Sequence, residues 1–171
     1  MTGTALNTTP SDREPRGTAE SGAAARAAEL LAANINPKTG LATDYLNHFN
    51  EAIMLLEMIP DVPECAEDFL HWQPLSYREH FTASHFKARD LAISAYDSAD
   101  RAVRAEFDQL TDTMTSILTA VSAAMREAQQ DSTRARLAEQ ATNWVKPLVA
   151  LAGGIVNGQG CEPDVDFIMN H

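Results

Sequence analysis

The stretch TDYLNHFNEAIMLLEMI, residues 43–59, decides the fold class, because its apolar residues recur at the spacing of an α-helix. On a helical wheel with roughly 100° per residue, eight apolar residues between positions 42 and 59 share one broad side. They are Ala42, Tyr45, Leu46, Phe49, Ala52, Ile53, Leu56 and Ile59. We therefore expect a helix that has Thr43 as its N-cap, buries this side and stops before Pro60.

The rest of the chain predicts further helices and no strand of convincing length. Helical patterns cover residues 19–34, a short segment at 67–72, residues 75–98, residues 100–130, and a last helix from residue 131 to the glycine pair 153–154, kinked at Pro147. Such helices joined by short connections are typical of an antiparallel bundle. The prediction is an all-α fold: an antiparallel bundle of four to five helices over residues 19–155, after a disordered N-terminal arm (1–18) and before an acidic C-terminal tail (156–171).

The acidic composition of the chain makes two classes of binding partner unfavourable. The 171 residues include 24 acidic and 13 basic ones, a formal net charge of −11. Such a chain is a poor match for nucleic-acid backbones and for anionic membrane surfaces, so we expect neither as a partner. The N-terminus has no apolar signal segment, and Cys65 and Cys161 fit no zinc-binding spacing, which favours a cytoplasmic protein and leaves open whether these cysteines pair.

Acidic residues are concentrated in one part of the sequence. Between residues 39 and 77 there is no lysine or arginine, but there are seven acids: Asp44, Glu51, Glu57, Asp61, Glu64, Glu67 and Asp68. An acidic surface of this kind can dock a basic protein partner, or can simply be solvated. The predicted docking residues are Asp61, Glu64, Glu67 and Asp68 together with Trp72, although Trp72 could instead cap one end of the bundle.

A polar stripe on the helix at 43–59 suggests an alternative. Asp44, His48 and Glu51 stand at i, i+4 and i+7, so their side chains stack beside the apolar face. Oxygen and nitrogen ligands of this kind suit iron, zinc or manganese. His85, on the apolar side of the helix at 75–98, would complete the set, whereas His80 lies at the opposite edge. In the competing interpretation the histidines are structural and hydrogen-bonded within the bundle.

No nucleophile motif or phosphate loop is present in the sequence, so we expect no catalytic residues. The sequence therefore predicts a binding, adaptor or regulatory module that uses an acidic surface, and it leaves a homodimer open. The alternative is a metal-binding bundle, which could be a metal-dependent enzyme. The methionines at 54, 58, 114 and 125 are expected to fill the core.

Overall fold

The computed structural model describes residues 16–159, and within them the chain is all-helical, as predicted. The helices are α1 (Arg16–Ala32), α2 (Leu46–Met58), α3 (Cys65–His71), α4 (Tyr77–Ala83), α5 (Arg89–Asp97), α6 (Arg101–Glu127) and α7 (Asp131–Val156), with a 3-10 turn η1 (Thr43–Tyr45) before α2. None of the helices in the described part is long and apolar enough to cross a membrane.

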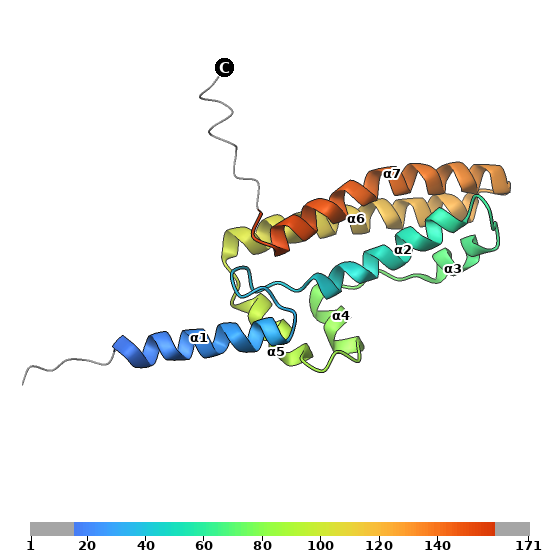
Figure 1. Ribbon diagram of the computed structural model, residues 1–171. Coiled ribbons are helices and arrows are strands. Elements are labelled where there is room, and N and C mark those ends of the chain that lie inside the picture. Colours follow the sequence, from blue (N-terminus) through green and yellow to red (C-terminus); the bar gives the residue numbers. More distant parts are fainter. Residues whose placement is uncertain (1–15, 160–171) are drawn as a thin grey trace, which may run out of the picture.

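The frame of the molecule is made by α6 and α7, which form an antiparallel hairpin, and by α2, which lies along them (Figure 1). Asp100 starts α6, because its carboxylate accepts hydrogen bonds from the backbone N–H groups of Ala102 and Val103. The predicted apolar side of residues 42–59 is buried, and Phe49 and Leu56 are completely inaccessible. Lys146 of α7 pairs with Glu57 near the end of α2, at 2.6 Å.

The predicted number of helices is wrong for the described residues, because the single helix expected at 75–98 is two helices. A capping box of Ser76 and Glu79 begins α4, which ends at Ala83. The Ser84 hydroxyl then donates to the carbonyl of Phe81 and accepts from the N–H of Phe86, so side-chain hydrogen bonds turn the chain before α5 begins. As a result α4 and α5 lie beside the α2–α6–α7 frame and do not extend it (Figure 1).

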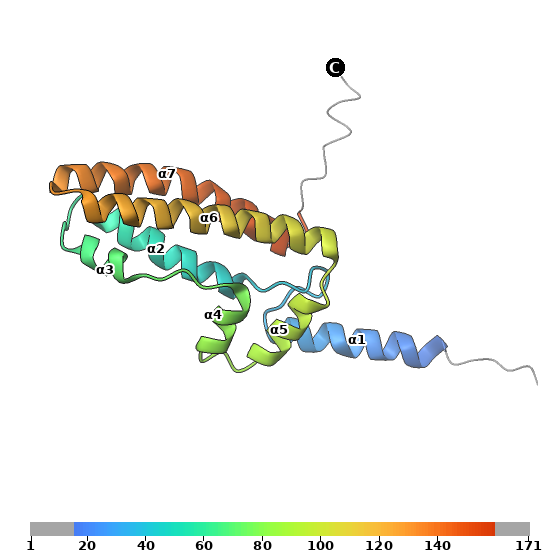
Figure 2. The ribbon, with the colours of Figure 1, turned by 180° about the vertical axis from the view of Figure 1, so that it is seen from behind.

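Several predicted boundaries also differ from the structure. α1 begins at Arg16, inside the arm that was expected to be disordered up to residue 18, and it projects away from the bundle in both views (Figures 1 and 2). α7 continues through Pro147 and past Gly153 to Val156. Thr43 lies inside the 3-10 turn and is not an N-cap. Residues 1–15 and 160–171, which hold most of the predicted arm, Cys161 and most of the predicted tail, lie outside the described residues.

Candidate functional site

The outer side of α2 presents apolar side chains to solvent. Met54, Met58 and Val62 are 54%, 42% and 42% exposed. The prediction that Met54 and Met58 fill the core is therefore wrong, whereas Met114 and Met125 are fully buried as expected. The reason is geometric: Met54 and Met58 lie one helical turn apart on the side of α2 that faces away from α6 and α7.

These apolar residues continue in one line past the end of α2. The N–H of Val62 donates to the carbonyl of Met58 at 2.8 Å, and the N–H of Asp61 donates to the same carbonyl at 3.2 Å. The backbone thus completes one more turn, which places Val62 above Met58. We call the surface of Glu51, Met54, Met58, Asp61 and Val62 the outer face of α2; all five side chains are exposed.

Acidic side chains border the outer face of α2, and few bases compensate them. Glu57 pairs with Lys146 at 2.6 Å, and Glu67 of α3 pairs with Arg134 of α7 at 3.7 Å. The other acids of this region have no ion pair with another residue in the part of the chain that the structure describes. They are Glu51, Asp61, Glu64 and Asp68. Unpaired like charges on one surface repel each other, and a basic partner would relieve that repulsion.

The structure separates the five predicted docking residues into two groups. Asp61, Glu64, Glu67 and Asp68 are all exposed. Trp72 is half-buried and turned toward α2, where its ring stacks on His48 with 4.6 Å between centroids. Its indole N–H donates to the His48 carbonyl at 3.1 Å. The connection after α3 is therefore fastened to α2 by an aromatic stack and a hydrogen bond.

His48 is the most buried polar group of this region. The residue is 8% exposed, and its Nε2 has no hydrogen-bond partner in the part of the chain that the structure describes. Burial lowers the pKa of His48 below 6.5, and the nearby His80 lowers it further; a backbone hydrogen bond with Gln73 and the charge of Glu51 act in the opposite direction. His48 is therefore neutral at neutral pH.

The predicted metal set is not brought together. Asp44 pairs with His80, with 3.0 Å between Oδ2 and Nε2, while Glu51 and His85 are exposed. Within residues 16–159, no group of three or more His, Cys, Asp or Glu side chains could hold a metal ion. The break between α4 and α5 changes the helical phase, so His80 and not His85 faces α2. The Ser76–Glu79 capping pattern marks where α4 begins, and Ser84 is the residue whose side-chain hydrogen bonds turn the chain after it.

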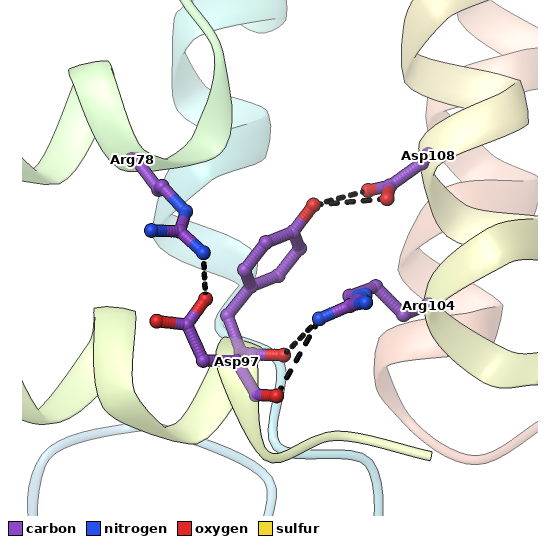
Figure 3. Close-up of polar contacts among 5 residues, drawn as sticks. Arg78, Asp97, Arg104 and Asp108 are labelled. Atoms are coloured by element: carbon purple, nitrogen blue, oxygen red, sulfur yellow. Dashed lines mark hydrogen bonds and ion pairs between the residues drawn. The ribbon is translucent and has the colours of Figure 1, made fainter. Parts of the chain in front are cut away.

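A second polar cluster fastens α5 to α6, and sequence reasoning missed it. The hydroxyl of Tyr96 is 2.8 Å and 2.9 Å from the two carboxylate oxygens of Asp108. Arg104 lies over the Tyr96 ring, 5.4 Å from its centroid, and reaches the carbonyl of Asp97, whose carboxylate pairs with Arg78 (Figure 3). Burial and the bond to Asp108 raise the pKa of Tyr96 to about 12, so the phenol stays protonated as a donor. These contacts hold α5 against α6.

The comparisons with known proteins identify no family for this chain. No protein-family model, no curated protein and no solved structure matches it.

Proposed function

We propose that this protein is a protein-binding module that docks a partner with a basic surface on the acidic end of α2 and α3. The observation that carries the proposal is the exposure of Asp61, Glu64, Glu67 and Asp68, of which only Glu67 has an ion pair with another residue among residues 16–159. In the sequence these acids lie within the stretch that has no lysine or arginine.

Electrostatics supports binding of a basic partner for two reasons. Acids that outnumber the bases on a surface create a negative potential that speeds the encounter with a positively charged molecule. Exposed charges are also screened by salt over a distance of about 10 Å at 0.1 M, so an interaction of this kind weakens as ionic strength rises. Binding that depends strongly on salt is therefore the expected signature.

The test is a binding titration with a fluorescently labelled octalysine peptide at low and high salt. The variant E64K/E67K/D68K reverses three acids of the surface. The matched control E20K/D90K/D112K reverses three exposed acids of α1, α5 and α6, so that both variants carry the same net charge. We expect the first variant to lose at least about tenfold in affinity, which corresponds to about 1.4 kcal/mol, and the control to lose much less.

Two results would contradict the proposal. In one, octalysine does not bind the unaltered protein even at low salt. In the other, both triple variants lose affinity equally, which would mean that net charge alone attracts the peptide and that the end of α2 and α3 has no special role.

A further inference from the structure

The apolar residues on the outer face of α2 form a stripe whose length matches two turns of a partner helix. Met54, Met58 and Val62 are spaced at i, i+4 and i+8, and the hydrogen bond from Val62 to Met58 keeps the last of them in line. With a rise of about 1.5 Å per residue, the stripe is about 12 Å long, or two helical turns. A partner helix presents its own apolar residues at i, i+4 and i+7 over the same length.

The side chains of this stripe suit a binding surface. Single exposed apolar residues are common on protein surfaces, whereas apolar residues gathered on one face are typical of interaction sites. Methionine is unbranched and flexible, so Met54 and Met58 can adapt to the shape of a partner. Both residues are about half exposed although the core beneath them is tightly filled, with Phe49, Ala52 and Leu56 fully buried.

The charges beside the stripe define the chemistry of the partner. Glu51 lies one turn before Met54, Glu57 lies one turn after it, and Asp61 lies one turn after Met58. The base that reaches this surface in the described chain is Lys146, which Glu57 already engages. An occupant of the stripe therefore meets carboxylates along its edges, which favours a helix flanked by lysine or arginine.

An apolar groove between α6 and α7 is the main competitor, and its charges do not define a partner. It is lined by Leu110, Leu148, Leu151 and Ile155, and Leu151 is 51% exposed. Glu106 is the only charged side chain of its lining among the described residues. Leu151 therefore serves as a matched control for the exposed methionines.

We infer that the outer face of α2 binds a basic amphipathic helix, whose apolar side covers Met54, Met58 and Val62 and whose basic side chains meet Glu51 and Asp61. This inference rests on the proposed function, which it deepens by naming the form of the partner. Apolar burial then adds to charge attraction, so affinity depends on the pattern of the partner's residues as well as on its charge.

The test compares two labelled peptides of identical composition, each built from leucine and lysine. In one, the leucines recur at i, i+3 and i+4, so that it forms an amphipathic helix; in the other, the same residues are scrambled so that no apolar side exists. We expect the amphipathic peptide to bind at least about tenfold more tightly. In M54Q/M58Q this preference should disappear while binding of octalysine persists, and L151Q should behave like the unaltered protein.

The outcomes separate the inference from the proposed function. Equal binding of the two leucine–lysine peptides, or an unchanged preference in M54Q/M58Q, overturns the inference and leaves the proposed function standing if octalysine still binds. Absence of binding by all three peptides overturns both. A dimer seen by sedimentation that M54Q/M58Q converts to a monomer would assign the face to a second copy of this chain and also overturn the inference. Far-UV circular dichroism checks that M54Q/M58Q is folded, as expected for exposed positions.

Discussion

Replacing Gly40 by alanine should destabilise the protein strongly, because at this glycine the loop after α1 packs closely against α5. Its φ angle is +71°, a conformation that residues with a side chain rarely adopt. A Cβ atom at this position would lie 2.7 Å from the carbonyl oxygen of Ala95 and 3.4 Å from the Cβ of Ala99. The Ala95 oxygen belongs to the backbone of α5, so it cannot move away without disturbing the helix.

The magnitude follows from two separate penalties. The left-handed backbone costs an alanine roughly 1–2 kcal/mol. The forced contact with α5 adds roughly 1–3 kcal/mol, as for other overpacked sites. We therefore expect G40A to lower the free energy of unfolding by roughly 2–5 kcal/mol, a large part of the stability of an ordinary domain.

The same substitution at Gly153 should have the opposite effect and serves as the control. Gly153 is inside α7 and its φ is not positive; a Cβ there meets Leu46 at 3.8 Å, an ordinary contact. Because glycine is a poor helix former, G153A should raise the free energy of unfolding by roughly 0.5–1 kcal/mol. Urea denaturation followed by circular dichroism measures both variants, and the midpoint should fall for G40A and rise for G153A. A loss below about 0.5 kcal/mol in G40A, the range of neutral surface substitutions, would refute the reasoning.

Three further predictions test the buried groups. Because the pKa of His48 is below its usual 6.5 in the folded protein, the unfolded chain binds more protons near that pH, so the free energy of unfolding should fall as pH drops through 6.5. Urea titrations at several pH values should show a weaker fall in H48Q than in the unaltered protein. Identical profiles would contradict the lowered pKa of His48. Burial raises the pKa of Asp108, and the hydrogen bond from Tyr96 partly offsets this effect, so an NMR titration of Y96F should show the pKa rising further, with a loss of about 1 kcal/mol in stability. An unchanged pKa would mean that the hydroxyl does not support the carboxylate. M114A should cost roughly 2–5 kcal/mol and M54A less than about 0.5 kcal/mol in the same denaturation assay, and the reverse order would contradict the burial of Met114.

The candidate site could be predicted in part. The acids at 61–68 are exposed because carboxylates without partners stay in water, a property of each residue that needs no tertiary structure. The exposure of Met54 and Met58 follows from the same helical wheel that predicts the buried side of residues 42–59, because both residues lie opposite that side. The prediction that they fill the core was wrong because it rested on the apolar character of methionine, which is found both in cores and on surfaces.

The wrong prediction of a single helix at residues 75–98 also led to the wrong positions for His80 and His85. Treating residues 75–98 as one helix fixes the relative phase of His80 and His85, and the turn at Ser84 removes that relation. His80 then reaches Asp44, and His85 is left exposed. The stacking of Trp72 on His48 likewise depends on the path of the connection between α3 and α4.

The all-α class, the buried side of residues 42–59 and the asymmetry of charge can be predicted from the sequence, because helical periodicity depends on neighbouring residues and charge depends on composition. The packing of the helices adds two features that the sequence does not reveal: His48 is enclosed, with no hydrogen-bond partner for its Nε2 among residues 16–159, and Tyr96 joins α5 to α6. Those features arise where separate helices meet, and the position of α4 relative to α5 depends on the turn at Ser84, whose side-chain hydrogen bonds redirect the chain.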